Sequence, residues 1–499
     1  MKKLCFLLAI VLLLSGCSHA APNISPAQPA TIPTEEAVSE SSLVRFDIYA
    51  VNDLHGRLTD TDMQPGVDEL STYLKLAQQA GNTILLSTGD MWQGAAESSL
   101  TGGLIVTDWM NQMDFAAMTI GGHEYDWGEE GIYQNQALAD FPFLGINVYD
   151  RATDTQADYC QSSLIVEIDG VQIGIIGAIG DCSNSIASEN IQNVYFKTGD
   201  ELTALVRAEA EALRNEGADF IIYTIHDGSA LTSDGINAMP VGSEELNDYY
   251  DTTLSDGYVD LVFEADSHYW YSLIDEYGVY HLQAGGNNQG ISHAAVLIDK
   301  ATGTADILTA ELLPASKYAT MADDPALMQL LEKYSEQIAP AAQVLGSNSQ
   351  YKNNNMLGDL VAKLYRDAGM EKWGAAYDIV LGGGYIFCRS PGYLSAGEVT
   401  YGQLMSLLPF DNQITLCSIR GSDLISRFLE NDHYAYHIHT TPYGDSIRSS
   451  IDPESTYYVV TDSYSAYYAA NNMTVIDIYS EDVFARDLLA DYIAAGGLG

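Results

Sequence analysis

Histidine and carboxylate side chains gather in five short stretches of the chain, each directly after an apolar run typical of a β-strand. The stretches carry Asp53 with His55, Asp90, His123 with Asp126, His226, and Asp266 with His268. Imidazole and carboxylate groups bind divalent cations and serve as general acids or bases. Because α/β folds place their chemistry beyond the carboxyl ends of strands, the stretches predict one shared polar site. A single Asp-x-His pair is more often a satisfied pair of loop residues, but five such stretches favour a functional site.

The elements that must position these residues alternate between strand and helix. The strand-like runs before the five stretches are residues 46–51, 84–87, 115–120, 220–225 and 259–263. Helix candidates at 67–80 and 201–216 and further strand candidates at 171–177 and 293–298 lie among them. Alternation of this kind predicts an α/β domain, which we place at residues 44–315.

A proline-started helix separates this region from the rest of the chain. One of two adjacent aspartates suits the N-cap position and Pro325 suits the first turn, and the predicted helix runs to about residue 338. We take residues 316–345 as a linker with a connecting helix. Residues 346–499 then form a second, smaller domain.

The first 17 residues predict a signal peptide rather than part of the fold. Two lysines precede an apolar run that ends in Leu14, Ser15, Gly16 and Cys17, a lipobox-like end that implies cleavage before Cys17 and lipidation of its thiol. A simple secretory peptide is the alternative. Residues 18–43 are rich in Ala, Pro, Ser, Thr and Glu and predict a flexible tether. We therefore expect an exported protein, anchored by lipid to the cell membrane and facing away from the cytoplasm.

The chain is strongly acidic. Lys plus Arg number 21 against 68 Asp plus Glu, which gives a formal net charge of −47. Such a surface repels nucleic acid polymers and anionic lipids, and it argues against a DNA- or RNA-binding module. It also repels phosphorylated small molecules, so a phosphate site here would need bound cations and a few well-placed arginines.

Four cysteines follow the predicted lipid site. They are Cys160, Cys182, Cys388 and Cys417. Outside the cytoplasm they could form two disulfides in any of three connectivities, or remain free as small apolar residues. Their spacing does not resemble a compact disulfide framework, which favours free thiols.

In their order, the five stretches resemble the calcineurin-like metallophosphatases, specifically the two-domain 5'-nucleotidase and 2',3'-cyclic-nucleotide phosphodiesterase family. The resemblance runs from about Arg45 to near the C-terminus. It implies an N-terminal four-layer αββα sandwich with its ligands on loops at one edge, followed by a smaller α/β domain that recognises the substrate. It also implies that the connecting helix lets the second domain swing against the first.

The resemblance further implies two divalent cations, drawn from Mn, Mg, Ca or Zn. The first would be held by Asp53, His55 and His268, with Asp90 bridging to a second held by Asp90, His226 and Asp266. His123, oriented by Asp126, would donate a proton or hydrogen bond to the phosphate. The chain departs from the family at Gly122, where the family has Asn, and at Asp266, where it has His. The extra carboxylate favours Mn²⁺, Mg²⁺ or Ca²⁺ over Zn²⁺ at the second position and weakens the electrophile.

Four residues of the second domain match or replace the family's substrate contacts. Arg389 is the phosphate candidate, a single displaced arginine where the family has two, and its alternative is a solvated loop residue. Phe410, Asn412 and Tyr464 match the positions that stack on and hydrogen-bond a base. The Gly-Gly-Asp that contacts ribose in the family is absent after Tyr464.

These residues predict a surface-anchored, metal-dependent phosphoesterase that hydrolyses nucleotides, of the 5'-nucleotidase or cyclic-nucleotide phosphodiesterase type, by a metal-activated water. The alternative is a catalytically degenerate relative that binds nucleotide or metal without turnover, which Gly122 and Asp266 support. Because seven of the nine expected catalytic and metal positions are intact, the enzyme is favoured. An adhesin or structural surface protein has only the anchor and tether in its favour.

Overall fold

The computed structural model describes residues 42–60, 65–228, 258–275, 277–430, 436–440, 447–467, 472–480 and 482–499. The predicted signal peptide with Cys17, and the predicted tether as far as residue 41, lie outside the described residues. Residues 42–499 form one compact unit. Among the described residues, there is no helix that combines the length and the apolar character needed to cross a membrane.

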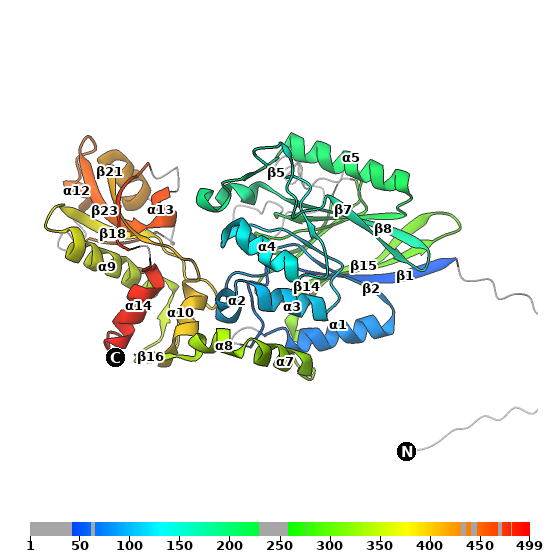
Figure 1. Cartoon of the computed structure of the whole chain (residues 1–499), viewed down its shortest axis with the longest axis horizontal. Coiled ribbons are helices and arrows are strands. Elements are labelled where there is room, and N and C mark those ends of the chain that lie inside the picture. The colour runs from blue at the N-terminus through cyan, green and yellow to red at the C-terminus, as the bar shows by residue number, and fades with distance from the viewer. Residues whose placement is uncertain are drawn as a thin grey trace, which may run out of the picture. The chain divides into compact units, whose positions relative to one another are not determined.

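Two six-stranded sheets form the first half of this unit (Figure 1). The first sheet has the order β15 (Thr304–Pro314), β14 (Gly290–Asp299), β1 (Leu43–Val51), β2 (Asn82–Ser87), β3 (Ala117–Thr119) and β4 (Phe143–Leu144). The second has the order β12 (Trp270–Ile274), β13 (Tyr280–Ala284), β11 (Leu261–Phe263), β10 (Phe220–His226), β8 (Val171–Ile179) and β7 (Ser163–Ile168).

The central strands of both sheets are parallel. In the first sheet, β1, β2 and β3 run side by side in one direction, and in the second sheet β8, β10 and β11 do the same. Since parallel strands end at a common edge, the loops that follow them meet there. Every predicted metal ligand lies at the end of one of these strands or just beyond it.

Apolar contacts build the layers of the sandwich. Side chains such as Phe46, Ile222 and Val296 fill the space between the two sheets. On the outer face of the first sheet lie α1 (Asp68–Ala80) and α3 (Leu104–Gln112), and on the outer face of the second lies α5 (Asp200–Glu216). The predicted four-layer α/β sandwich is therefore confirmed.

The predicted connecting helix is two helices rather than one. Asp324 caps α7 (Pro325–Lys333) by accepting a hydrogen bond from the backbone N–H of Ala326 at 3.2 Å. The helix breaks at Tyr334, a buried residue whose hydroxyl donates to Oδ2 of Asp108 at 3.3 Å. The chain resumes as α8 (Ser335–Ile338). The backbone N–H of Tyr334 still donates to the oxygen of Leu330, and its own oxygen accepts from the N–H of Ile338, so the interruption is confined to this residue.

A five-stranded sheet forms the second half. Its order is β22 (Tyr436–His439), β18 (Ile379–Tyr385), β23 (Thr456–Asp462), β21 (Ile414–Arg420) and β24 (Thr474–Ile478). The long helix α9 (Asn354–Trp373) packs on β18. Gly382 permits this close approach, because a Cβ there would lie 2.4 Å from the backbone nitrogen of Arg366.

Shorter elements complete the described chain. The helices are α2 (Ala96–Leu100), α4 (Gly128–Leu138), α10 (Tyr401–Leu407), α11 (Gly421–Leu424), α12 (Ile447–Ser450), α13 (Ser463–Tyr467) and α14 (Ala485–Ala494). The strands are β5 (Val148–Asp150), β6 (Thr155–Gln156), β9 (Val194–Phe196), β16 (Val344–Asn348), β17 (Lys352–Asn353), β19 (Tyr393–Leu394) and β20 (Gly397–Thr400). All four predicted extracytoplasmic cysteines are free thiols.

A buried cluster of charged groups supports the second sheet behind the Asp266 loop. Nδ1 of His281 lies 2.8 Å from Oε1 of Glu264, and its Nε2 lies 3.4 Å from Oδ2 of Asp275. Burial opposes a positive charge on His281, but the two carboxylates outweigh it and raise its pKa to about 9. The imidazolium therefore neutralises acidic groups that would otherwise be buried together.

Replacing His281 with Leu is expected to lower the free energy of unfolding by roughly 3–5 kcal/mol, because two buried carboxylates lose their partner. The pKa of His281 lies above its ordinary value of 6.5 in the folded protein. Its contribution is therefore complete below the ordinary value and fades as the pH rises through about 9. Urea denaturation of the wild type and of His281→Leu at about pH 6 and about pH 10 measures the free energy of unfolding of each protein. If the two proteins differed by the same amount at both pH values, the charge of His281 would not be the source of the stabilisation.

Candidate metal and substrate site

Five of the predicted metal ligands have left-handed backbone conformations. The φ angles are 50° at Asp53, 51° at His55, 55° at Asp90, 61° at Asp266 and 55° at His268. Residues other than glycine rarely adopt this region, and each instance costs on the order of 1 kcal/mol or more. Such strain concentrates at functional sites, where it aims side chains at a common point. Here it turns the loop residues of both sheets toward one another.

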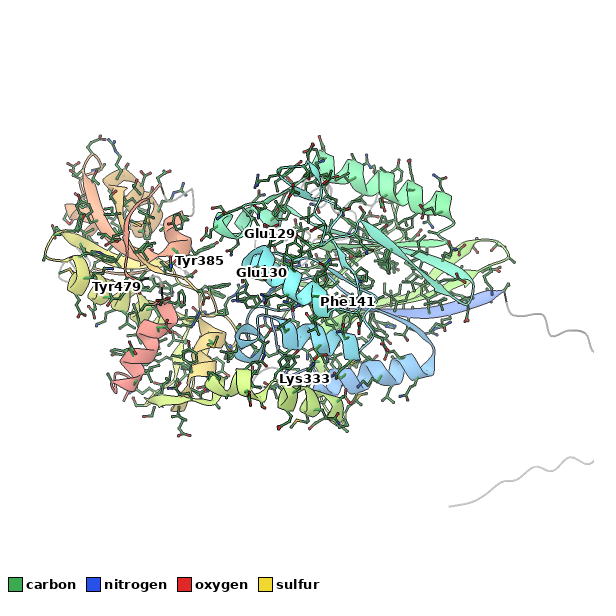
Figure 2. The ribbon with its side chains drawn as sticks, in the orientation of Figure 1. Glu129, Glu130, Phe141, Lys333, Tyr385 and Tyr479 are labelled. Carbon is green, nitrogen blue, oxygen red and sulfur yellow. The ribbon has the colours of Figure 1, made fainter. Side chains whose placement is uncertain are left out.

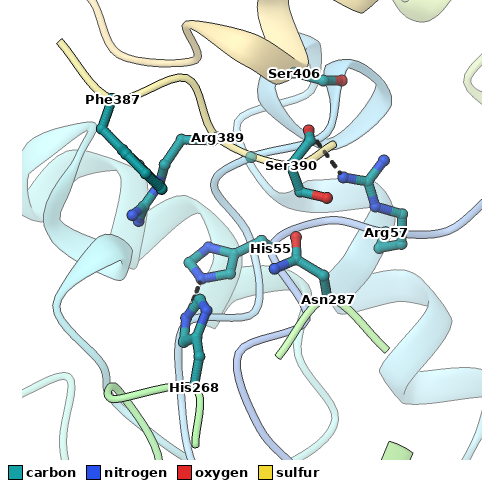
Figure 3. Close-up of a pocket in the computed structure, with 9 residues that line it drawn as sticks. His55, Arg57, His268, Asn287, Phe387, Arg389, Ser390 and Ser406 are labelled. Atoms are coloured by element: carbon teal, nitrogen blue, oxygen red, sulfur yellow. Dashed lines mark hydrogen bonds between the residues drawn. The ribbon is translucent and has the colours of Figure 1, made fainter. Parts of the chain in front are cut away.

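The first group of side chains comes from the loops after β1 and β11. Ligand atoms of Asp53, His55 and His268 lie within 4.8 Å of one another. Nδ1 of His55 donates to the backbone oxygen of Gln93 at 2.9 Å, so its Nε2 carries a lone pair. That lone pair accepts a hydrogen bond from Nε2 of His268 at 3.0 Å, which Figure 3 marks with a dashed line. Burial and His268 together hold the pKa of His55 well below its ordinary value, which keeps this imidazole neutral.

The second group joins the ends of β2 and β10. Nδ1 of His226 donates to the backbone oxygen of Thr88 at 2.7 Å, which turns Nε2 toward Asp90. Burial opposes a charge on His226, but Asp90 outweighs it and raises the pKa of the imidazole well above its ordinary value. His226 is fully buried, and its Nε2 makes no hydrogen bond to the part of the chain that the structure describes. It nevertheless lies 3.1 Å from Oδ1 of Asp90. Donors that share a metal ion at about 2.0–2.2 Å are separated by roughly 3–3.5 Å, so these residues fit a divalent cation.

His123 stands beside the two groups and faces the substrate side. Its Nδ1 lies 2.8 Å from Oδ2 of Asp126, and its backbone N–H donates to Oδ1 of Asp90 at 2.8 Å. Burial opposes its protonation, but Asp126 and Asp90 outweigh that effect and raise the pKa of His123 to about 9. Nη2 of Arg389 lies 2.7 Å from Nε2 of His123. Because a guanidinium can only donate, Nε2 of His123 is the acceptor of this hydrogen bond. The two side chains thus meet at the point of the cleft where a phosphate oxygen could replace their contact.

All four predicted substrate residues line one cleft. The cleft has a volume of about 560 Å³, and Arg389, Phe410, Asn412 and Tyr464 contribute to its wall together with His123 and Asp126. The Phe410 ring stacks on the His123 imidazole with centroids 5.4 Å apart. Tyr464 lies beside Tyr385, which Figure 2 labels, with ring centroids 5.9 Å apart. A volume of this size suits a small organic ligand with one aromatic ring system.

Sequence reasoning assigned no role to Glu124, although the motif contains it. Its buried carboxylate accepts hydrogen bonds from the backbone N–H groups of Asp90, Met91 and Gly121 at 2.7–2.9 Å. This carboxylate fixes the loop that presents Asp90. Burial and the charge of Asp90 raise the pKa of Glu124 to about 7. The sign of this role in the sequence was the position of Glu124 directly after His123.

Gln93 and Cys182 are further residues that the sequence did not single out. The Gln93 side-chain amide is buried, lines the cleft and has no hydrogen-bond partner among the described residues. Cys182 also lines the cleft, in the loop that follows β8. Burial and the neighbouring carboxylates Asp266 and Asp227 raise the pKa of its thiol.

Comparisons with known proteins agree with this architecture. Residues 336–476 match the family model of the 5'-nucleotidase C-terminal domain. The endonuclease YhcR of Bacillus subtilis (strain 168) is 26% identical over 415 residues, which cover 76% of this chain and only 32% of that protein. A 5'-nucleotidase of Vibrio cholerae is 23% identical over 464 residues, covering 83% of this chain and 80% of the relative. The solved 5'-nucleotidase precursor of Thermus thermophilus aligns with a TM-score of 0.68 at 17% identity, over 90% of this chain and 96% of that one.

The solved structure shares the fold, and the sequence comparisons find nucleotidases along most of the chain. Histidine and carboxylate side chains lie at one edge of the two six-stranded sheets. Most of the C-terminal sheet lies within the region that the family model matches. The chain is therefore similar to 5'-nucleotidases along most of its length, shares the fold of a solved 5'-nucleotidase, and matches the 5'-nucleotidase C-terminal domain over residues 336–476.

Proposed function

We propose that the protein hydrolyses the phosphate ester of nucleotides and that this activity depends on two divalent cations. The observation that carries the proposal is the buried His226 side chain. Its Nε2 lies 3.1 Å from Oδ1 of Asp90, and ligand atoms of the buried residues Asp53, Asp90 and His226 lie within 4.8 Å of one another. Burial opposes a positive charge on His226, but Asp90 outweighs it and raises the pKa of this imidazole. A divalent cation can replace the proton that Asp90 favours there and bond both side chains.

The residues divide into two ligand sets. Asp53, His55 and His268 would hold the first cation, and His226 and Asp266 the second, with Asp90 between the two sets. When bound, such a pair of cations lowers the pKa of an attacking water and stabilises charge on the phosphorus oxygens. The backbone carbonyls that accept from the Nδ1 atoms of His55 and His226 fix each imidazole in the ligand tautomer.

The chain's own donors would act on the phosphate. Nη2 of Arg389 donates to Nε2 of His123 at 2.7 Å. A phosphate oxygen that displaced this contact would accept hydrogen bonds from both side chains. Asp126 holds the Nδ1 atom of His123 and orients Nε2 toward the cleft. His123 can thus stabilise the charge that develops on phosphorus or give a proton to the leaving oxygen. Arg389 supplies the fixed positive charge that an acidic protein needs for an anionic substrate.

The aromatic wall of the cleft favours a nucleotide over a simple phosphate ester. Phe410 and Tyr464 line the same cleft as Arg389, and Asn412 adds an amide that can hydrogen-bond to a base edge. The Bacillus relative is named as an endonuclease. A net charge of −47 opposes binding of a nucleic acid polymer to the present chain, so we propose small nucleotides as substrates.

We also propose that the protein works outside the cytoplasm on a lipid anchor at Cys17. The support is the N-terminal sequence: two lysines, an apolar run, and Leu14, Ser15 and Gly16 immediately before Cys17. Another relative, from Listeria monocytogenes, is named as a cell wall protein. The acidic residues after Ser18 would keep the folded unit away from an anionic membrane surface.

Removing metal is expected to abolish phosphate release, and adding Mn²⁺, Zn²⁺ or Co²⁺ to restore it. His123→Ala is expected to lower the rate by about 10²–10⁴-fold without changing the number of bound cations, because His123 contacts the phosphate and is not a ligand. Phosphate release from a panel of nucleotides and cyclic nucleotides, with metal content measured in parallel, tests this. Glu130→Ala, an exposed change on α4, is the matched control. Two bound cations without phosphate release from any substrate would instead identify a degenerate binder.

Tyr464→Ala is expected to weaken nucleotide binding by roughly 1–3 kcal/mol, the scale of base–aromatic stacking. Tyr464 is chosen because Phe410 also contacts His123. Michaelis constants for a nucleotide and for a phosphate ester without a base separate the effects. Tyr464→Ala should raise the Michaelis constant for the nucleotide only. The control Tyr351→Ala, a change at an exposed tyrosine elsewhere, should alter the Michaelis constant of neither substrate. Equal losses on both substrates would place the base in a different part of the cleft.

Cys17→Ser is expected to move the protein from the membrane fraction to the soluble fraction while leaving phosphate release intact. The reason is that serine cannot accept the lipid that a lipobox cysteine accepts. Fractionation of cells that express each form, with a high-salt wash of the membranes, measures the change. A Cys17→Ser protein that stays in the washed membranes would contradict the lipid anchor.

A further inference from the structure

Five parallel strands of the two sheets, β1, β2, β3, β10 and β11, lead into the predicted catalytic and metal-binding residues. Strand β8 ends at the same edge, because it pairs in parallel with β10 so that Ile179 lies opposite His226. The chain then turns into a short 3₁₀ helix, Asp181–Ser185, which carries Cys182. The register thus brings a thiol to the same edge as the second ligand set.

The contacts place this thiol among ligand atoms. Sγ of Cys182 donates to the backbone oxygen of His226 at 2.9 Å. Potential ligand atoms of Cys182, His226 and Asp266 all lie within 4.8 Å of one another. Cys182, Asp266 and Gly122 line the same cleft, so the thiol stands at the part of the site where Gly122 offers no side chain.

Gly122 leaves space in this part of the site. A Cβ at Gly122 would meet only Ile186, whose Cγ1 lies 3.9 Å away, among the residues that the structure describes. Ile186 directly follows the 3₁₀ helix of Cys182. The segment that carries the thiol therefore lies next to the position of the missing amide ligand.

The β8 loop is held in place by contacts that do not involve Cys182 itself. The carboxylate of buried Asp227, the residue after His226, accepts from the backbone N–H of Asp181 at 2.6 Å. Gly180 allows this approach, because a Cβ there would lie 2.1 Å from Oδ2 of Asp227. The position of Cys182 relative to His226 is therefore set by the fold.

We propose that Cys182 is a ligand of the second cation, together with Asp90, His226 and Asp266. The Nε2 atom of buried His226 makes no hydrogen bond to the described residues and lies 3.1 Å from Oδ1 of Asp90, a separation that suits two ligands of one cation. On binding, the thiol loses its proton to solvent and its sulfur lone pair bonds the cation, with no change of oxidation state. This inference rests on the metal dependence proposed above.

A thiolate reverses the metal preference expected from the carboxylates alone. Three ligand types, imidazole, carboxylate and thiolate, favour Zn²⁺, Co²⁺ or Fe²⁺ over Mg²⁺ or Ca²⁺. The first ligand group, with Asp53, His55 and His268, includes no cysteine of the described chain. The two positions would therefore differ in metal selectivity, with the softer cation at the second.

Cobalt loading of the metal-free protein tests the assignment. Wild-type protein with two Co²⁺ bound is expected to show a sulfur-to-cobalt charge-transfer absorption, and Cys182→Ser is expected to lose it. Cys417→Ser, which removes a buried thiol in β21, should keep it. Zn²⁺ affinity at the weaker site should fall by about 10-fold or more in Cys182→Ser, while Mg²⁺ affinity changes little. Two bound Co²⁺ without the absorption, or an absorption that survives in Cys182→Ser, would overturn the proposal.

A second measurement uses only the wild-type protein. Alkylation of Cys182 by iodoacetamide, followed by mass spectrometry of its peptide, is expected to slow when Zn²⁺ is added and not when Mg²⁺ is added. An unchanged rate with Zn²⁺ bound would overturn the assignment. If phosphate release depends on metal but Zn²⁺ does not slow the alkylation of Cys182, the proposed function stands and only the assignment of Cys182 as a ligand fails. A protein that binds no cation would contradict both.

Discussion

The structure depends on a concentration of lone pairs and negative charge at one edge of two sheets. Three carboxylates, Asp53, Asp90 and Asp266, and the imidazoles of His55, His226 and His268 point into one small region. The imidazoles offset part of the repulsion between these carboxylates, as His226 does 3.1 Å from Asp90, while the left-handed backbone of the loops adds strain. The parallel strands and the four layers around them supply the free energy that holds the loops in place. The fold therefore maintains an unfavourable arrangement that bound cations would offset.

Electrostatics also explains the form of the substrate side. A chain with a net charge of −47 has no general attraction for a phosphate. Positive charge is instead local: Arg389 reaches the cleft from the C-terminal half, and His123 with its raised pKa reaches it from the first half. These two groups lie 2.7 Å apart, where a phosphate can separate them. Selectivity for an anion thus arises from a few donors and from the proposed cations.

The sequence predicted those parts of the site that follow a local rule. Each His or Asp just beyond an apolar run was recognisable, because a strand end is a local pattern and its edge position follows from parallel pairing. Glu124 and Cys182 were not recognised, since their roles depend on contacts with loops 33 or more residues away. The helical segment after Pro325 ends at Ile338 as predicted, and only the one-residue interruption at Tyr334 between α7 and α8 was not indicated by the pattern.

Gly122 illustrates how sequence and structure lead to different interpretations of one change. In the sequence it is the loss of a metal ligand, and with Asp266 it suggests a site that has lost its function. In the structure, the space beside Gly122 adjoins the segment that carries Cys182, and the buried His226 lies 3.1 Å from Asp90. The loops at Asp90 and Asp266 also keep the left-handed backbone that aims their side chains at the site. These features favour our proposal that the second site has a different ligand set over the alternative that it has been lost.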